Sequence, residues 1–476
     1  MKFSALANYL NGSSASFDGD TLDVTSPLDG STLTNVPLSG STELQQAIEF
    51  GEAAFEEWSK QTVKQRVQVL FRYRSLLEEN KEELAELVHW ENGKTVGEGR
   101  AEVDKAIEVT EFACSLPQLT TGEVLEVSPG VECRIDRVPL GVVASITPFN
   151  FPCMVPHWTI PIAIGLGNSL ILKPSEKVPL TAVRSAELMS EAGLPNGVFQ
   201  ILHGDRQIVE AICDEPRIQA LTFVGSTPIA KSVYGRAAAS GKRILALGGA
   251  KNHLVVLPDA EPAQTAENVA ASMAGCAGQR CMAASALVAV GDCDTIIDQI
   301  CSEASKYVPG ETLGAVITHE SKERIERYIN EAEEQGAKVL LDGRQPVVPG
   351  CENGSYVGPT VLDGVSPDMA IAQDEIFGPV LAVIRAKDID EAIDIENRSQ
   401  FGNAAAVYTE NGSSAKNVVE NASAGMIGVN IGVPVPREPF GFGGWNDSRF
   451  GVGDITGKAS IDLWTQSRKV TTRWNA

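Results

Sequence analysis

The sequence is poor in basic residues and has no long uninterrupted apolar segment. Lys and Arg number 39 against 62 Asp and Glu, which gives a net charge of -23 at pH 7. This balance argues against a nucleic-acid partner, because phosphate binding requires concentrated Lys and Arg. The longest apolar run, 155–172, contains a histidine, two prolines and an asparagine. A buried helix and strand therefore explain this run better than a membrane span.

Signals for metals, disulfides and export are also missing. The five histidines are scattered without an HExxH motif, and the nine cysteines include no CxxC pair. Residues 1–14 lack the apolar core of a secretory signal. We therefore expect a cytoplasmic protein with reduced thiols and no bound metal. The GxGxxG motif of many dinucleotide sites is absent as well, since GLGNSL at 165 and GVGDITG at 451 do not match it.

What remains is a pattern of alternating strands and helices. A chain of 476 residues predicts two or three domains. Residues 41–114 have helical periodicity, and residues 118–136 alternate as an exposed ribbon would. Short branched-apolar runs then alternate with helical stretches, in one series to about 250 and in a second series after it. This predicts two doubly wound α/β domains with a cleft between them, followed by a strand over 460–474.

Two strand ends carry polar residues that suit a nucleotide. Lys173 and Glu176, in KPSE, follow the run SLIL, and together they could hold the hydroxyls of a ribose. An exposed turn with a surface salt bridge explains the same residues. Gly225 and Ser226, in FVGST, end another strand where a helix begins. Backbone N–H groups at that point could receive a phosphate, and a plain helix N-cap is the alternative.

The stretch GCAGQRCMAAS, 275–285, contains the most distinctive cysteine of the chain. Cys281 follows Arg280 and is flanked by small residues. A neighbouring positive charge favours the thiolate and hence a nucleophile, whereas a buried structural cysteine is the alternative. Cys276 has no adjacent charge in the sequence, and we interpret it as a core residue.

The order of the motifs resembles one enzyme family. TPFNFP, KPSE, FVGST, LGGAKNH, GQRC and DEIFGPV follow one another over more than two hundred residues. Together they closely resemble the aldehyde dehydrogenase superfamily, and the likeness extends over nearly the whole chain. The resemblance implies a Rossmann-like NAD-binding domain (1–117 and 137–250), a catalytic domain (251–440) and an oligomerisation ribbon (118–136 and 459–476). It also implies a homodimer or homotetramer.

The resemblance assigns roles to individual residues. Cys281 is the expected nucleophile, and Asn150 is the expected side-chain donor to the oxyanion. Lys173 and Glu176 are placed on the adenosine ribose, which favours NAD over NADP because a carboxylate repels a 2′-phosphate. Expected cofactor contacts are Thr147, Pro148, Phe149, Lys173, Ser175, Glu176, Gly225, Ser226, Leu247, Glu375 and Phe377.

One departure from the family pattern concerns how the reaction ends. Hydrolytic members carry a glutamate before the Leu-Gly-Gly stretch, where it activates water, but this chain has Ala246 there. GAKNH and GQRCM resemble the methylmalonate-semialdehyde dehydrogenase branch, which lacks that glutamate and transfers the acyl group to coenzyme A. We therefore expect coenzyme A as co-substrate. Hydrolysis, with Asp454 or Glu375 as the replacement base, is the alternative.

The substrate expectation rests on cations near the nucleophile. In that branch two arginines hold the substrate carboxylate; Arg280 matches the first, and Lys105 stands in place of the second. Lysine keeps the charge but loses the bidentate fork. A small acidic aldehyde is expected, and a sulfonate or phosphate group could replace the carboxylate. Arg437, in PREPFGFGG, is a further candidate cation or a plain surface residue.

Two readings from other classes are weaker. A catalytically silent relative would be expected to lack Cys281 or Asn150, and both are present. A cysteine hydrolase without a cofactor would need a histidine base. His157 and His253 are the candidates, but neither lies in a hydrolase motif.

Overall fold

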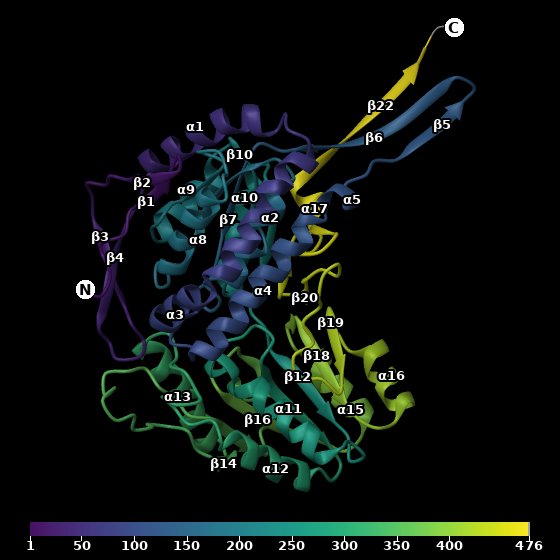
Figure 1. Cartoon of the computed structure of the whole chain (residues 1–476). Helices are drawn as coiled ribbons and strands as arrows, with labels where there is room; N and C mark the ends of the chain where they lie inside the picture. The colour runs from purple at the N-terminus through teal and green to yellow at the C-terminus, as the bar shows by residue number, and fades with distance from the viewer. Residues whose placement is uncertain (475–476) are drawn as a thin grey trace.

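The computed structural model describes residues 1–474 of the chain. Two large sheets form the centre of the molecule (Figure 1). The first sheet has the strand order β2-β1-β9-β8-β7-β10-β11-β21. Its strands are β1 (Asn8–Leu10), β2 (Ser13–Ala15), β7 (Val142–Ile146), β8 (Ser169–Lys173), β9 (Phe199–Ile201), β10 (Ile218–Val224), β11 (Arg243–Leu247) and β21 (Arg449–Phe450).

The parallel part of this sheet fixes where a ligand can bind. Strands β9, β8, β7, β10 and β11 pair in parallel, and the chain order reverses at β7. The carboxyl ends of β7 and β10 therefore flank a topological switch point, which is where open α/β sheets bind their ligands. The flanking helices are α1 (Ser41–Trp58), α2 (Val63–Glu79), α3 (Lys81–Asn92), α4 (Val96–Cys114), α5 (Leu116–Leu119), α6 (Met154–His157), α7 (Ile160–Gly165), α8 (Leu180–Glu191), α9 (Arg206–Asp214) and α10 (Thr227–Ala239).

The second sheet has the order β14-β15-β16-β13-β12-β18-β19 and is parallel except at the β14–β15 pair. Its strands are β12 (Asn252–Val256), β13 (Ala284–Val290), β14 (Lys338–Leu341), β15 (Thr360–Asp363), β16 (Val380–Ala386), β18 (Ala404–Tyr408) and β19 (Met426–Val429). The helices around it are α11 (Pro262–Ala274), α12 (Asp294–Ala304), α13 (His319–Glu334), α14 (Ala370–Gln373), α15 (Ile389–Asn397) and α16 (Gly412–Asn421). The predicted fold of two doubly wound α/β units is confirmed.

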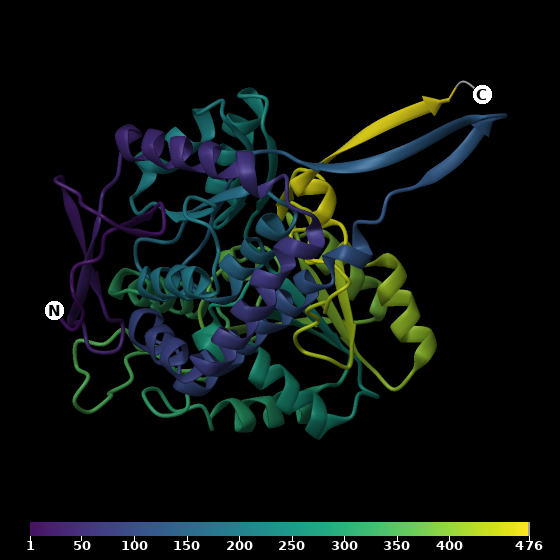
Figure 2. The same cartoon turned by 45° about the horizontal axis from the view of Figure 1, so that its top comes forward.

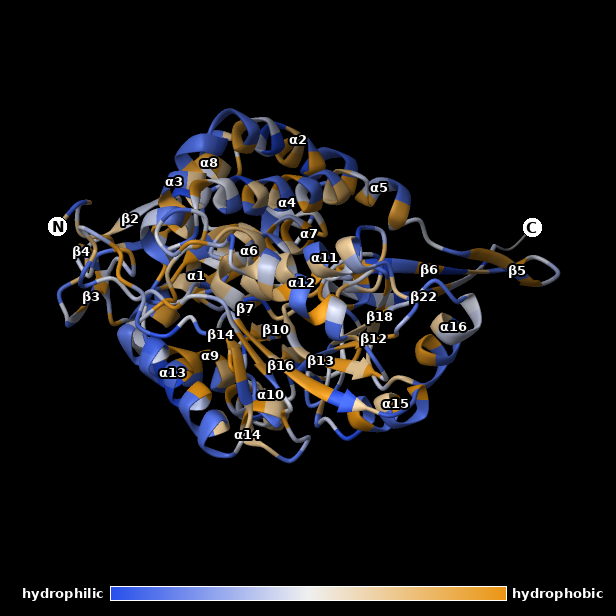
Figure 3. Ribbon diagram, turned by 90° about the horizontal axis from the view of Figure 1, so that it is seen from below, coloured by the Kyte–Doolittle hydropathy of each residue, from blue (hydrophilic) through white to orange (hydrophobic). Residues whose placement is uncertain are grey.

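Burial follows the hydropathy of these elements. Strands β13 and β16 are apolar and lie inside, whereas α13 and α15 present hydrophilic faces outward (Figure 3). Apolar side chains of β12, β13, β16 and β18 form one core cluster with the inner faces of the surrounding helices. Because both faces of the strands are covered, their sequences are nearly continuous in Val, Ile, Leu and Ala.

A three-stranded ribbon projects from the body and carries the C-terminal end of the chain (Figures 1 and 2). It consists of β5 (Val124–Ser128), β6 (Val131–Pro139) and β22 (Thr465–Arg473), with β22 antiparallel to β6 along its whole length. The strand predicted over 460–474 is wrong at its start, because residues 460–464 form the short helix α17 (Ser460–Trp464) with a buried tryptophan. The last two residues of the predicted ribbon segment, 475–476, lie outside the described residues.

Smaller elements complete the chain. They are the hairpin of β3 (Thr21–Thr25) and β4 (Thr32–Pro37), the pair β17 (Phe401–Gly402) and β20 (Trp445–Asn446), and a 3-10 turn over Gly275–Gly278. Within residues 1–474, no helix combines the length and the apolar character that crossing a membrane requires.

Candidate active site

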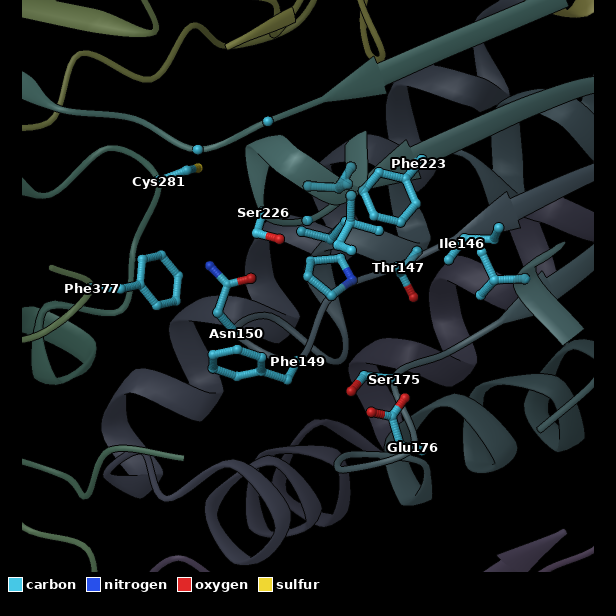
Figure 4. Close-up of a pocket in the computed structure, with 18 of the residues that line it drawn as sticks. Ile146, Thr147, Phe149, Asn150, Ser175, Glu176, Phe223, Ser226, Cys281 and Phe377 are labelled. Carbon is cyan, nitrogen blue, oxygen red and sulfur yellow. The ribbon is translucent and has the colours of Figure 1, made fainter. Parts of the chain in front are cut away.

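A cavity of about 510 Å³ opens at the switch point of the first sheet. It runs from Ser175 and Glu176 at one end to Cys281 and Phe377 at the other (Figure 4). Among its lining residues are Thr147, Pro148, Phe149, Asn150, Lys173, Ser175, Glu176, Gly225, Ser226, Cys281, Glu375 and Phe377. Leu247 is buried beside it, and its carbonyl accepts a hydrogen bond from the Gly225 amide (3.1 Å). The structure thus brings together residues that the sequence spreads over more than two hundred positions.

One end of the cavity has the chemistry of a ribose site. Lys173 Nζ lies 2.9 Å from Glu176 Oε2, and the Lys173 side chain is only 5% exposed. An exposed surface salt bridge is therefore the wrong interpretation of KPSE. Burial acts to raise the pKa of Glu176, but the Lys173 ammonium outweighs it and the net pKa is lowered. The carboxylate remains ionised at neutral pH and can accept hydrogen bonds from ribose hydroxyls.

The first turn of α10 borders the middle of the cavity. Ser226 is the N-cap residue of this helix, yet its side chain makes no capping hydrogen bond. The plain helix N-cap, which was the alternative from the sequence, is therefore present in position but lacks the side-chain hydrogen bond. The first amides of a helix have no acceptor within the helix, and Ser226 and Ile229 of this terminus line the cavity wall. Such a terminus suits a phosphate group through both its amides and its dipole.

Glu375 occupies the far part of the cavity in an unusual electrostatic setting. Its carboxylate accepts a hydrogen bond from the Ala250 amide (2.9 Å). Burial raises the pKa of Glu375 to about 7, against the opposing charge of Lys251. Gly249 leaves room for this group, because a Cβ at that position would overlap Glu375 Oε2 and the carboxylate would have to shift. The Glu375 carboxyl group therefore changes its charge close to physiological pH.

Phe377 follows in the same segment and closes the cavity near the cysteine. Its backbone lies in the left-handed region with φ of 54°. Its ring meets that of Phe149 edge to face, with centroids 5.7 Å apart. The neighbouring Gly378 packs so closely against Gly278 that a Cβ on Gly278 would overlap the Gly378 carbonyl. The cysteine loop and the DEIFGPV segment therefore hold each other in place.

The main chain of Cys281 is fixed by two amide side chains. Its carbonyl accepts hydrogen bonds from Asn252 Nδ2 and from Asn403 Nδ2, both at 2.8 Å. Before it, Cys276 and Ala277 have positive φ values of 53° and 52°. L-residues adopt this conformation at a cost, so the loop stores strain that these contacts offset. Asn252 and Asn403 are functional residues that sequence reasoning missed.

The Cys281 side chain is partly exposed where two cavities meet. Burial within the protein raises the pKa of its thiol to about 12, and the Glu375 charge adds to this effect. Arg280 acts in the opposite direction but is the weaker influence. Arg280 thus favours the thiolate, as the sequence suggested, but burial outweighs it and the net pKa of Cys281 is raised.

The Arg280 guanidinium is directed to a different cysteine. It lies against Gly275, where a Cβ would collide with it, and its charge acts on the thiol of Cys276. Cys276 is buried, which confirms the interpretation of it as a core residue, although the Arg280 charge lies near it in space. The four-residue turn between Gly275 and Arg280 brings these groups together, which the order of residues in the sequence did not suggest.

Asn150 faces Cys281 across the cavity (Figure 4). Its Nδ2 donates one hydrogen bond to the carbonyl of Gln279 (2.9 Å). An amide nitrogen carries two hydrogens, so a second donor remains for an oxyanion. A donor held by the protein before reaction is what stabilises a developing negative charge most effectively.

A buried ion pair supports Asn150 from behind. Lys94 Nζ lies 2.6 Å from Glu102 Oε2, with side chains 2% and 1% exposed. Lys94 also donates to the carbonyl of Asn150, and Glu102 accepts from the amides of Cys153 (2.7 Å) and Met154 (3.0 Å). Sequence reasoning missed this pair, because the residues are eight positions apart and belong to no local motif.

A second cavity, of about 350 Å³, reaches Cys281 from the other side. Lys105, Arg280 and Arg437 line it together with apolar residues that include Phe151, Trp158 and Phe442. Both predicted substrate-binding cations therefore lie in one cavity with the nucleophile candidate. Lys105 Nζ is already paired, at 2.8 Å from Glu438 Oε2 and 3.0 Å from Glu108 Oε2.

The other candidates from the sequence lie elsewhere. His157 is buried and hydrogen-bonds to Tyr73 (2.7 Å), and His253 is buried in β12. Among described residues lining the two cavities there is no histidine, so a Cys–His hydrolase site is not formed. Asp454, a candidate base, lies 3.7 Å from Arg449 and does not line either cavity. Ala246 lies in β11 and is buried in an apolar cluster. In residues 1–474, no cluster of His, Cys, Asp and Glu suits a metal ion.

An α/β fold with a dinucleotide-type cleft and a cysteine at its end defines a class of cofactor-dependent oxidoreductase. The model of the aldehyde dehydrogenase family matches residues 14–470. The chain belongs to the aldehyde dehydrogenase family. This confirms the resemblance drawn from the motifs.

Individual relatives cover the chain almost completely. Malonate-semialdehyde dehydrogenase 2 of Geobacillus thermodenitrificans is 45% identical over 98% of this chain and 99% of its own length. Malonate-semialdehyde dehydrogenase 1 of Geobacillus kaustophilus is 42% identical over 99% and 98%. The crystal structure of methylmalonate-semialdehyde dehydrogenase from Oceanimonas doudoroffii superimposes with a TM-score of 0.98 at 39% identity, covering 100% of this chain and 99% of that one. A Sinorhizobium meliloti structure provisionally assigned to the same activity, and complexed with NAD, matches with the same TM-score, identity and coverage.

Proposed function

We propose that the protein is an NAD-dependent aldehyde dehydrogenase that oxidises a short acidic semialdehyde and passes the acyl group to coenzyme A. The likeness to malonate- and methylmalonate-semialdehyde dehydrogenases over the full length supports this assignment. The observation that carries the last step is Ala246, a buried methyl group at the position where hydrolytic relatives hold their base. A methyl group cannot activate water.

The cleft residues fit a nicotinamide dinucleotide. At one end, Lys173 provides a hydrogen-bond donor and Glu176 provides an ionised acceptor. The N-terminus of α10 lies in the middle. Gly249 leaves the space that Glu375 needs, so that this carboxyl group can bind the second ribose. The Glu176 carboxylate repels a 2′-phosphate, which favours NAD over NADP.

The chemistry begins at Cys281. Its thiol loses a proton to solvent, and the sulfur attacks the aldehyde carbon to form a thiohemiacetal. The oxygen that becomes negative is held by the free N–H of Asn150, which Lys94 and Gln279 keep in place. The chemistry supplied by bound NAD is acceptance of a hydride, and departure of that hydride from the carbon leaves a thioester on Cys281.

Release of the product requires a second nucleophile. Attack of the coenzyme A thiolate on the thioester carbon breaks the bond to Cys281 and regenerates the cysteine. A thiolate needs less activation than water, so the chain needs no base at position 246. We also propose that residues 1–117 and 137–250 bind the cofactor, that 251–440 carry the catalytic residues, and that the ribbon joins subunits in a homodimer or homotetramer.

The experiment is NADH formation against a panel of small aldehydes, neutral and acidic, with and without coenzyme A. We expect highest kcat/KM for a three-carbon aldehyde bearing one carboxylate, and acyl-CoA as the product detected by mass spectrometry. Free acid as the main product in the presence of coenzyme A would contradict the acyl-transfer step. An absence of NADH with every aldehyde would contradict the oxidation itself.

A further inference from the structure

Lys105, a cation that lines the second cavity, forms an ion pair with Glu438, which is not among the lining residues. Glu438 Oε2 lies 2.8 Å from Lys105 Nζ, and the two side chains are 9% and 16% exposed. The residues are 333 positions apart, and Glu438 belongs to the PREPFGFGG stretch that departs from the related branch. A carboxylate of the protein therefore already neutralises the ammonium that would bind a substrate carboxylate.

Lys105 has a second acidic partner that reinforces this pairing. Glu108 Oε2 lies 3.0 Å from the same ammonium, and Glu108 Oε1 lies 3.2 Å from Arg437 Nη1. Glu108 is 38% exposed, so solvent screens its charge more than that of Glu438. The two cations Lys105 and Arg437 are thus balanced by the two carboxylates Glu108 and Glu438.

Arg280 is the third cation that lines this cavity, and it differs from Lys105 and Arg437 in having no carboxylate partner among the described residues. In the described part of the chain it forms no ion pair within 4.0 Å, in contrast to Lys105 and Arg437. Glu98 is the nearest acidic influence on it, and that carboxylate accepts a hydrogen bond from the Cys276 amide. Arg280 also precedes the nucleophile candidate directly. It is the cation best placed to meet the anionic group of a short substrate bound to Cys281.

We propose that Glu438 is a specificity-determining residue that restricts the substrate to aldehydes with a single negative charge. The proposal rests on the proposed function and narrows its substrate class. A monoanionic aldehyde pairs with Arg280 and leaves the Lys105–Glu438 pair intact. A dianionic group, such as a phosphonate, needs a second cation and instead meets a Lys105 ammonium that Glu438 already neutralises. Repulsion between like charges in a partly buried site is an efficient means of rejecting the wrong ligand.

The apolar wall of the cavity also favours a monoanionic aldehyde over a dianionic one. Phe151, Trp158 and Phe442 line it and provide neither charge nor strong donors for an extra anionic oxygen. A phosphonate that displaced Glu438 from Lys105 would leave that carboxylate without its nearest cation. A partly buried acid deprived of its partner is destabilised. The bound dianionic aldehyde is therefore destabilised, and its KM is higher than that of the monoanionic aldehyde.

The test compares three aldehydes of similar length: propanal, the three-carbon aldehyde carboxylate, and its phosphonate analogue, which is doubly charged at pH 8. In Glu438→Gln, Lys105 becomes available, so the kcat/KM ratio of phosphonate to carboxylate should rise by about tenfold or more, mainly through a lower KM for the phosphonate. Glu438→Asp retains the charge and should keep the ratio near that of the unmodified protein.

Two further variants distinguish the specific effect of Glu438 from a general loss of negative charge near Lys105. Glu108→Gln removes one negative charge from the same ammonium but leaves Glu438 in place, so its effect on the ratio should be much smaller. Lys105→Met combined with Glu438→Gln should abolish the gain, because the gain requires the free ammonium. An unchanged ratio in Glu438→Gln, or an equal rise in Glu108→Gln, would overturn the proposal. Failure of all three aldehydes to give NADH in the unmodified protein would instead overturn the proposed function.

Discussion

The protonation state of Cys281 leads to a specific prediction about reactivity and pH. Burial raises the pKa of this thiol to about 12, so the thiolate fraction of the free protein is roughly one in 100,000 at pH 7. Alkylation by iodoacetamide proceeds through the thiolate. Its rate should therefore increase up to tenfold for each pH unit, with no plateau below pH 9.5.

Glu375 modifies this slope in a predictable direction. Its pKa is about 7, and its negative charge raises the pKa of Cys281. As the pH rises through 7, Glu375 ionises and holds back the ionisation of the thiol. The slope of log rate against pH should therefore fall below 1 between pH 6 and 8, and return to 1 above that range. In Glu375→Gln the slope should be 1 throughout, with faster alkylation at pH 8 than in the unmodified protein.

The assay is mass spectrometry of the peptide containing Cys281 after timed alkylation at a series of pH values, without NAD. Cys281→Ser serves as the control for labelling of other cysteines. A rate that levels off below pH 8 would refute the reasoning, because it would show that the thiol ionises in the neutral range despite its burial. Identical slopes in Glu375→Gln and the unmodified protein would refute the coupling between the two groups.

Three further predictions follow from the cleft. Asn150→Ala should reduce kcat about 100-fold or more through loss of an oxyanion donor, while NAD binding measured by fluorescence titration is retained; an unchanged kcat would contradict this role. Lys94→Met should lower the stability by about 3–5 kcal/mol, measured by the urea-unfolding midpoint, because it leaves Glu102 buried and unpaired, and Lys94→Met combined with Glu102→Leu should recover part of the loss. Glu176→Gln should weaken NAD binding and reduce the preference for NAD over NADP, and equal affinities before and after the change would count against a ribose contact.

The fold was predictable because short local patterns in the sequence indicate most of its strands and helices. Branched-apolar runs that end in Gly, Pro or Asn indicate buried parallel strands whatever their partners are, and the centres of both sheets consist of such strands. The helix at 460–464 is the exception. Its Trp464 is buried against the body, whereas alternation alone favours a strand there. Tertiary packing overrode the local pattern at this point.

The site was predictable only where its residues form motifs. Cys281 and Asn150 lie in GQRC and TPFN, which identify the family from the sequence. The contacts that tune them come from distant positions: Asn403 binds the Cys281 carbonyl across 122 residues, and Glu438 reaches Lys105 across 333. Such pairings depend on how the two sheets pack and leave no periodic signal. For the same reason the sequence did not reveal that the Arg280 guanidinium lies against Gly275 and acts on the thiol of Cys276 as well as on Cys281.

The most direct test of the central claim is the stoichiometry of NADH in the first turnover. Enzyme in micromolar amounts is mixed rapidly with NAD and a three-carbon aldehyde carboxylate, first without and then with coenzyme A. The account predicts a burst of one NADH per Cys281 that stops without coenzyme A, an acyl group on that cysteine by mass spectrometry, and steady turnover once coenzyme A is added. Continuous turnover in water alone, with no acyl group on Cys281, would contradict it.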